Sequence, residues 1–256
     1  MQFNKEQTKA LKELLYLLAD DELILGHRNS EWTGLGPILE EDIAFSSMAQ
    51  DKIGHAQNFF EMLHELGEPE PDTNAFARDE NLFRCCHFVE YPIGEYNFSL
   101  MRHFLFDHAM FIRYGMLSGS SYEPLASAVR KFKGEMIYHV LHADTWIKQL
   151  SQADEESYRL MQSALDECLP LALGMFETLS GENLLSDSGI YSGEELLRQS
   201  WIEKVVPLIE SAGLILPDLN NIQPAFGGRK GIHTDYLKPL LDEMSEVFKI
   251  DPDAEW

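Results

Sequence analysis

The amino-acid sequence predicts an all-α protein, a four-helix bundle with additional C-terminal helices. Two observations carry this prediction. Every long segment repeats its apolar residues at the 3.6-residue period of an α-helix, and no segment sustains the strict alternation of a half-buried strand. The chain has 256 residues, 45% of them hydrophobic, so it can bury a sizeable core. We expect one domain over residues 1–256, with the bundle core at about 4–150 and accessory helices and a tail at 151–256.

Composition and charge exclude several classes of function. The formal net charge of −23 opposes binding to nucleic acid or anionic lipid, because both require clustered Lys and Arg. No run of ~18 apolar residues is present and the N-terminal segment is charged, so neither a transmembrane helix nor a signal peptide is predicted. Cys85, Cys86 and Cys168 form no C-x-x-C pair and are expected to be buried thiols. We therefore expect a soluble, cytoplasmic protein.

The first predicted helix begins at a capping box, because Asn4 and Gln7 have the spacing of that motif. Glu22 falls in its apolar stripe, where a buried carboxylate needs a cation or a metal to offset desolvation. Asp20 and Asp21 beside it are expected to point to solvent. The apolar stripe is formed by Leu11, Leu15, Leu18 and Leu25.

A segment rich in Gly and Ser, residues 28–37, precedes a second long helix that is expected to end at Leu66. Two ionisable residues, Lys52 and His55, lie one turn apart inside its apolar and aromatic stripe. Prolines between residues 67 and 92 permit at most a short helix at about 80–89. The stripe is formed by Phe45, Met48, Lys52, His55, Phe59, Met62 and Leu66.

The third and fourth long helices repeat this pattern. Over residues 95–117, Asp107 is the only charge on the apolar stripe. The next helix begins near Pro124, a favoured first-turn residue, and carries Glu135 and His139 on its predicted inner face. Each of the four long helices thus places an ionisable residue at the centre of an apolar face.

The C-terminal part of the chain predicts accessory helices and one unusual loop. Helices are expected at 154–179, bent at Pro170, at 194–211 and at 236–248. Between the last two, residues 226–234 form a glycine-rich, locally basic segment that we expect to be flexible. Its Gly228, Arg229 and Lys230 are candidate contacts for an acidic partner surface or a phosphate, and an exposed glycine loop without such a role is the alternative.

The converging ionisable residues indicate a ferritin-like site. Di-iron and di-manganese bundles take Glu-x-x-His from each of two helices and one Glu from each of the other two. A single buried Glu or His is ordinarily a hydrogen-bonded core residue, so the repetition at matched depth carries the prediction. The positions are Glu22, Lys52 with His55, Asp107, and Glu135 with His139.

This ligand set is degenerate. Lys52 stands where Glu-x-x-His requires glutamate, and Tyr138 stands where the second histidine is expected, with His139 one residue further on. An ammonium at this depth repels cations and is expected to pair with Glu22, Asp107 or Glu135. We interpret the six positions as a metal site replaced by a salt-bridged polar core, with a residual single-metal site as the alternative.

Four stretches of the sequence occur in a characteristic order. They are Asp42-Ile43-Ala44, residues 51–59, residues 135–139, and residues 227–234 with the terminal Trp256. Together they resemble the C subunit of the bacterial ring-epoxidising phenylacetyl-CoA oxygenases, over roughly Leu18 to Trp256. The glycine-rich stretch is the specific one, since the helical stretches alone indicate only a ferritin-like protein.

The resemblance implies a component of a multicomponent monooxygenase of phenylacetate catabolism. In that family a related catalytic subunit holds the di-iron site and inserts one oxygen atom into the aromatic ring of phenylacetyl-CoA. A reductase subunit with FAD and an iron–sulfur centre delivers the electrons from NADPH. The C subunit is a non-catalytic, structural and regulatory scaffold without a cofactor of its own. The resemblance implies that this chain pairs with the catalytic subunit, whereas it meets the reductase and small subunits indirectly.

Two alternative functions stay open at this point. One is a free-standing bundle that binds an acyl-CoA through Arg229 and Lys230. The other is a self-sufficient carboxylate-bridged metal oxidase, which metal analysis would separate from a scaffold. Its ligands would be Glu22, His55, Asp107, Glu135 and His139.

Overall fold

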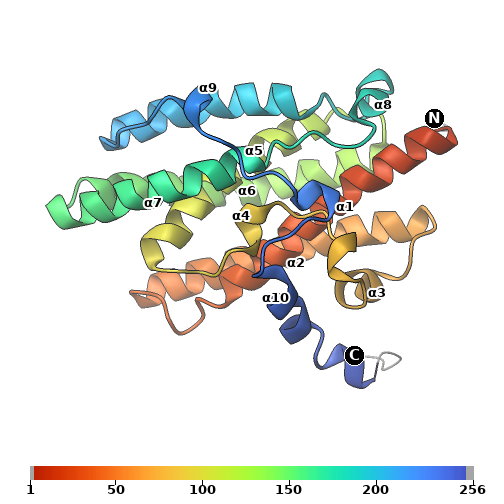
Figure 1. The fold of residues 1–256 in the computed structure, drawn as a ribbon, viewed down its shortest axis with the longest axis horizontal. Coiled ribbons are helices and arrows are strands. Elements are labelled where there is room, and N and C mark those ends of the chain that lie inside the picture. Colours follow the sequence, from red (N-terminus) through yellow and green to blue (C-terminus); the bar gives the residue numbers. More distant parts are fainter. Residues whose placement is uncertain (1–2, 252–256) are drawn as a thin grey trace.

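Two helical hairpins form the centre of the molecule (Figure 1). The computed structural model describes residues 3–251, and over that range the regular elements are all helical. α1 (Lys5–Ser30) packs against α2 (Leu39–Glu65), and α5 (Tyr96–Leu117) packs against α6 (Glu123–Ser151). The predicted all-α, ferritin-like bundle with additional C-terminal helices is confirmed.

The remaining elements are shorter or follow the bundle. The single helix expected at about 80–89 is two separate short elements, and the last helix is shorter than the predicted 236–248. In chain order the elements are α3 (Pro71–Phe76), η1 (Glu80–Leu82), α4 (His87–Glu90), α7 (Glu155–Gly174), α8 (Glu182–Asp187), α9 (Glu194–Ala212), η2 (Leu219–Asn221), η3 (Gly228–Lys230), α10 (Leu237–Met244) and η4 (Phe248–Ile250).

The predicted capping box starts α1. Asn4 Oδ1 accepts a hydrogen bond from Gln7 N at 2.9 Å, and Gln7 Oε1 accepts one from Asn4 N at 3.0 Å. Two backbone donors that the helix start leaves without partners are thereby satisfied. The first helix thus begins at the residue that the sequence indicates.

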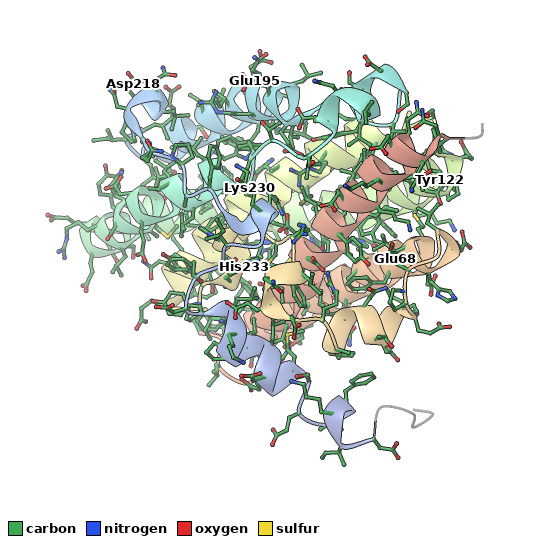
Figure 2. All side chains as sticks on the ribbon, turned by 45° about the vertical axis from the view of Figure 1, so that its right-hand side comes forward. Glu68, Tyr122, Glu195, Asp218, Lys230 and His233 are labelled. Atoms are coloured by element: carbon green, nitrogen blue, oxygen red, sulfur yellow. The ribbon has the colours of Figure 1, made fainter. Side chains whose placement is uncertain are left out.

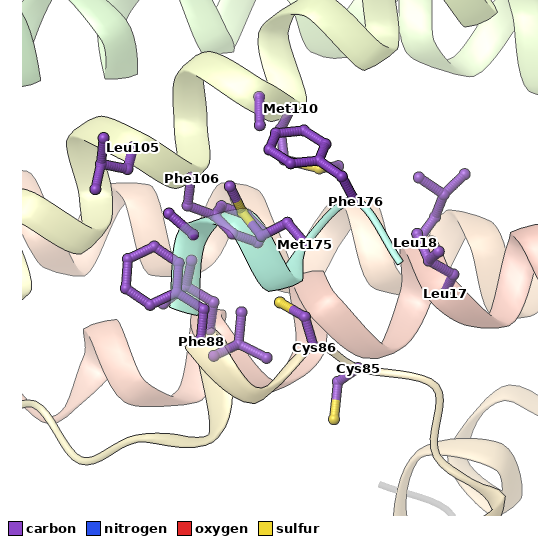
Figure 3. Packing of buried hydrophobic residues seen from close by; sticks show 14 of the residues in the cluster. Leu17, Leu18, Cys85, Cys86, Phe88, Leu105, Phe106, Met110, Met175 and Phe176 are labelled. Atoms are coloured by element: carbon purple, nitrogen blue, oxygen red, sulfur yellow. The ribbon is translucent and has the colours of Figure 1, made fainter. Parts of the chain in front are cut away.

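The accessory helices close the bundle on one side. Both α7 and α9 pack against α5 and α6, and α7 continues through Pro170. Trp201 of α9 is fully buried, and its indole Nε1 donates to Leu105 O of α5 at 2.9 Å. Figure 3 shows side chains from α1, α5 and the segment after α7 packed together, and one continuous apolar cluster joins the bundle to these later helices.

The tail crosses from α9 over α1 to α10, so that chain segments far apart in sequence meet near α4 (Figure 1). The predicted burial of the thiols is confirmed, since Cys85, Cys86 and Cys168 are all buried and free. Among residues 3–251, no helix is both long and apolar enough to cross a membrane.

Candidate functional site

Lys52 lies at the centre of the bundle and is 0% exposed. Its Nζ is 2.6 Å from Asp107 Oδ1 and 3.7 Å from Glu22 Oε2, and both carboxylates are fully buried too. The three residues come from three helices, α1, α2 and α5. They meet because each lies on the buried, otherwise apolar face of its helix. Of the three acids predicted as partners of Lys52, Glu22 and Asp107 are confirmed, whereas Glu135 contacts His55.

Mutual attraction keeps these three groups charged in spite of burial. Burial disfavours the charge on Lys52, but Asp107 and Glu22 outweigh it and raise the pKa of the ammonium. Burial also acts against ionisation of Asp107, but Lys52 and His103 hold the pKa of that carboxyl well below its usual range. The pKa of Glu22 is lowered in the same way, because Lys52 and His55 outweigh burial. The centre therefore holds a cation that belongs to the chain itself.

Glu135 does not lie on the inner face of α6. Its side chain is 47% exposed, and it reaches back so that its Oε2 lies 2.7 Å from His55 Nε2. The inward positions of this stretch are taken by Met136 and His139, both fully buried. The predicted inward position of Glu135 is thus wrong, because a helix places adjacent residues about 100° apart and only one of them can face the core.

His139 points inward as predicted and joins two carboxylates. Its Nδ1 is 3.2 Å from Asp107 Oδ2, and its Nε2 is 3.0 Å from Asp51 Oδ2. Burial opposes a charged ring, but the hydrogen bonds to Asp107 and Asp51 outweigh it and raise the pKa of His139. A doubly protonated ring, donating from both nitrogens, is the form that this geometry favours.

Sequence reasoning missed a second row of polar residues beside Asp107. His103 Nδ1 lies 2.7 Å from Asp107 Oδ2, and His103 Nε2 lies 3.3 Å from His142 Nδ1. His142 Nε2 is 3.0 Å from Glu41 Oε2, and the Tyr96 hydroxyl donates to the same oxygen at 2.6 Å. Burial lowers the pKa of His103 to about 4, so this ring is neutral at pH 7.

A sequence signal for this row exists. His103 precedes Asp107 by one helical turn, and His142 follows His139 at the three-residue spacing that keeps both on one face. We call the connected set the bundle network. Its members are Glu22, Glu41, Asp51, Lys52, His55, His103, Asp107, Glu135, His139 and His142.

The bundle network does not fit a di-iron centre. Such a centre requires carboxylates and histidines whose ligand atoms converge on two adjacent cations. Here the ammonium of Lys52 occupies the space between Asp107 and Glu22. Within residues 3–251, the acids and histidines of the network form no trio whose ligand atoms all lie within 4.8 Å of one another. Tyr138, at the expected place of the second histidine, is exposed.

Asp20 and Asp21 are buried, so their predicted exposure to solvent is wrong. Asp21 forms a two-pronged ion pair with Arg229, with Nη1 2.8 Å from Oδ1 and Nη2 2.7 Å from Oδ2. Asp20 pairs with Arg78 and accepts a hydrogen bond from Arg84 N at 2.7 Å. The tail and the segment before α4 cover this side of α1, which a helical period alone assigns to solvent.

The glycine-rich segment is also not the flexible, exposed loop that the sequence predicts. Gly228 and Arg229 are buried in η3, whereas the Lys230 side chain is 68% exposed and its Nζ lies 2.9 Å from Glu177 Oε1. Figure 2 shows Lys230 on this part of the tail. A contact between the segment and a partner or CoA stays a prediction, for which Lys230 supplies the exposed charge. Trp256, which belongs to the resemblance, lies outside the described residues.

The fold and the site define a ferritin-like bundle with a lysine at its centre. The family model described as "Phenylacetic acid catabolic protein" matches residues 1–256, and the chain belongs to this family. The chain is 32% identical over 240 residues to the C subunit of 1,2-phenylacetyl-CoA epoxidase from Escherichia coli (strain K12), covering 93% of this chain and 96% of that one. It is 23% identical over 206 residues to the A subunit of the same enzyme, covering 78% and 66%. The resemblance seen in the sequence is confirmed.

Proposed function

We propose that this chain is the C-type subunit of a phenylacetyl-CoA epoxidase complex and acts in the cytoplasm as a non-catalytic, structural and regulatory component. The similarity to the C subunit over nearly the whole length supports membership of the complex. The observation that carries the non-catalytic role is the Lys52 ammonium, 2.6 Å from Asp107 and 3.7 Å from Glu22 at the centre of the bundle.

The chemistry of an ammonium explains why this observation matters. A metal centre activates dioxygen because it has open coordination positions and exchanges electrons. An ammonium group has no coordination position and cannot exchange electrons. It does offset the desolvation of two buried carboxylates, which would otherwise repel each other. Lys52 therefore stabilises the fold and leaves oxygen chemistry to another subunit.

The catalytic partner in this proposal is a second ferritin-like chain similar to the A subunit. That chain would hold the di-iron centre and bind phenylacetyl-CoA, and a reductase with FAD and an iron–sulfur centre would supply electrons from NADPH. The resemblance of this chain to the A subunit, at 23% identity, is consistent with two related subunits, one of which has lost its metal ligands. This chain would need no cofactor from the bundle network.

Reconstitution tests the proposal. The purified chain alone should show no NADPH-dependent oxygen consumption with phenylacetyl-CoA. A mixture of this chain with the catalytic and reductase subunits should consume oxygen. Omitting this chain from the mixture should abolish or strongly reduce turnover, because the catalytic subunit then lacks its structural partner. Turnover by this chain alone, or full turnover without it, would overturn the proposal.

One observation favours a second candidate, a self-sufficient metal oxidase. Among residues 3–251, Glu22 Oε2 and His55 Nδ1 are buried without hydrogen-bond partners and lie 3.6 Å apart, a separation that a bound cation could bridge. Metal analysis of the purified chain discriminates between the two candidates. Iron or manganese that is lost in a His55→Gln variant, together with oxygen consumption by the chain alone, would favour the oxidase.

A further inference from the structure

A second group of potential metal ligands lies outside the bundle network, where the tail meets the segment before α4. Cys85 Sγ is 3.8 Å from Glu90 Oε1 and 4.0 Å from His233 Nδ1, and the last two atoms are 2.7 Å apart. All three side chains are fully buried. Within residues 3–251 this is the one trio of His, Cys, Asp or Glu whose ligand atoms all lie within 4.8 Å of one another.

Close backbone contacts hold the tail in place beside these residues. A Cβ on Gly228 would lie 2.1 Å from Cys85 O, and a Cβ on Gly231 would lie 2.2 Å from Asn81 O, so only glycine permits the approach. Arg229 adds its ion pair with Asp21 on the same side. His233 follows this closely packed segment in the tail, and the contacts of Gly228, Arg229 and Gly231 fix its position (Figure 2).

Outer hydrogen bonds orient two of the three ligands. His233 Nε2 lies 3.2 Å from Phe83 O, which only accepts, so Nε2 carries a proton. Glu90 Oε2 accepts from Thr234 N at 2.7 Å and from Thr234 Oγ1 at 2.6 Å. Metal-binding histidines and carboxylates are held by partners of this kind, which leave the other nitrogen or oxygen free to face the metal.

These outer bonds leave the inner atoms in conflict. With a proton at Nε2, the ring of His233 presents a lone pair at Nδ1, and Glu90 Oε1 also presents lone pairs, yet the two atoms are 2.7 Å apart. A second proton or a metal ion must therefore lie between them. Cys85 Sγ lies 3.8 Å from Glu90 Oε1 and 4.0 Å from His233 Nδ1, and sulfur is the softest of the three ligand types.

We propose that Cys85, Glu90 and His233 form a Zn²⁺ site that ties the tail to α4. Thiolate, imidazole and carboxylate are the ligands that Zn²⁺ takes in proteins, and a dication with two anionic ligands gives a buried site with no net charge. At Zn–S of ~2.3 Å and Zn–N or Zn–O of ~2.0–2.2 Å, tetrahedral ligand atoms are separated by roughly 3.3–3.6 Å. The 2.7 Å separation of Glu90 Oε1 and His233 Nδ1 would therefore widen by about 0.6 Å, and the two separations from the sulfur would shorten by roughly 0.2–0.4 Å. A fourth ligand would have to come from outside this trio, for example a water molecule.

Cobalt titration tests the site, since Co²⁺ replaces Zn²⁺ and reports its ligands by absorption. The full chain, freed of metal by a chelator, should bind Co²⁺ stoichiometrically with a thiolate-to-cobalt charge-transfer band and the intense visible bands of tetrahedral cobalt. Zn²⁺ should displace it and abolish the bands. Cys85→Ser should remove the charge-transfer band, and Thr234→Ala, which loosens Glu90, should weaken binding about 10–100-fold.

Cys86→Ser is the matched control. Its sulfur points to the opposite side of the same backbone segment, toward Phe88 and Met175, whereas the Cys85 sulfur points away from them (Figure 3). This variant should keep the cobalt bands unchanged. If Cys85→Ser does not fold, His233→Gln provides the second variant, and it should weaken binding at least about tenfold.

Three outcomes would overturn the proposal. These are the lack of a charge-transfer band in the unaltered chain, equal loss in the Cys85→Ser and Cys86→Ser variants, and unchanged affinity in His233→Gln. Any of them would assign a proton, and not a metal ion, to the position between Glu90 and His233, so that the two side chains would form a buried hydrogen bond. Zn²⁺ should also raise the thermal unfolding midpoint of the unaltered chain but not that of Cys85→Ser.

Discussion

The bundle network and the tail-docking region both bury several charges, but they balance them with different cations. By the tail-docking region we mean residues 227–234 with their partners Asp21, Cys85 and Glu90. In the bundle network, the ammonium of Lys52 lies between the carboxylates of Asp107 and Glu22. In the tail-docking region, Arg229 forms an ion pair with Asp21, and Cys85, Glu90 and His233 beside it form the proposed Zn²⁺ site.

This difference teaches that the fold alone does not decide where a metal binds. The bundle centre carries carboxylates and histidines from several helices, yet one lysine changes the charge balance of the whole centre. The tail-docking region lies outside the four long helices, yet a sulfur, an oxygen and a nitrogen ligand atom converge there. The predictions below test the two regions against each other.

The largest effect is expected from Arg229→Met. Within the described part of the chain it leaves the buried Asp21 with one remaining hydrogen-bond donor, Cys86 N at 2.8 Å, and it removes a hydrogen bond to Arg84 O. Removing one partner of a buried ion pair costs about 3–5 kcal/mol, and urea unfolding should show a loss of this size. Lys230→Met, next in sequence and largely exposed, should change stability by less than about 1 kcal/mol. Equal losses in both variants would contradict the account.

Lys52→Met should destabilise the protein by about 3 kcal/mol, at the lower end of that range. Asp107 keeps contacts with His103 and His139, so its charge is less isolated than that of Asp21 after the loss of Arg229. The exposed Lys131 is the control, because Lys131→Met makes the same chemical change at the surface. Urea unfolding that gives the same stability for both variants would show that Lys52 is not needed to balance the buried acids.

Gly228→Ala should destabilise the protein by about 1–3 kcal/mol, because the added Cβ would overlap Cys85 O. Gly134→Ala in α6 is the matched control, since a Cβ there would meet no atom of the described residues within 4 Å. That change should stabilise the helix by roughly 0.5–1 kcal/mol. A Gly228→Ala protein as stable as the unaltered chain would mean that the tail docks less closely than the structure shows.

The smallest effect is a difference in pH dependence. The pKa values of Asp107 and Glu22 are lowered from 3.8 and 4.5 in the folded state, where Lys52 outweighs burial. Lowered carboxyl pKa values contribute stability that is complete above these ordinary values and is lost as pH falls through the folded ones. The free energy of unfolding should therefore fall below about pH 4.5, and it should fall less steeply in Lys52→Met. Parallel profiles from urea titrations at several pH values would refute this linkage.

The long helices and the Lys52 ion pairs can be predicted because the spacing of apolar residues within each helix shows which side chains face the core. A 3.6-residue period shows which side of each helix is buried, and Lys52, Glu22 and Asp107 all lie on such sides. The capping box at Asn4 is visible in the sequence for the same reason. Glu135 marks the limit of this reasoning, since Met136 and His139 compete with it for the inward direction.

The tail-docking region cannot be predicted in this way, because its partners lie far apart in sequence. Asp21 and Arg229 are separated by 208 positions, and no periodic pattern links them. A glycine-rich basic stretch has the composition of an exposed loop. Position 228 nevertheless needs glycine because the backbone there packs directly against the carbonyl oxygen of Cys85. The second buried side of α1 arises only when the tail covers it, so a helical period assigns Asp20 and Asp21 to solvent.

The proposal that the Lys52 ammonium takes the place of a metal cation is the centre of this account. The most direct measurement compares Fe(II) and Mn(II) binding by the Lys52→Glu variant and by the chain with Lys52, both in a Cys85→Ser background that removes the tail site. Lys52→Glu restores Glu-x-x-His ending at His55, so it should bind metal at the bundle centre and regain stability through that binding. The chain with Lys52 should bind none there. If Lys52→Glu takes up no metal under conditions that load the catalytic partner, or if the chain with Lys52 binds it equally well, the claim is wrong.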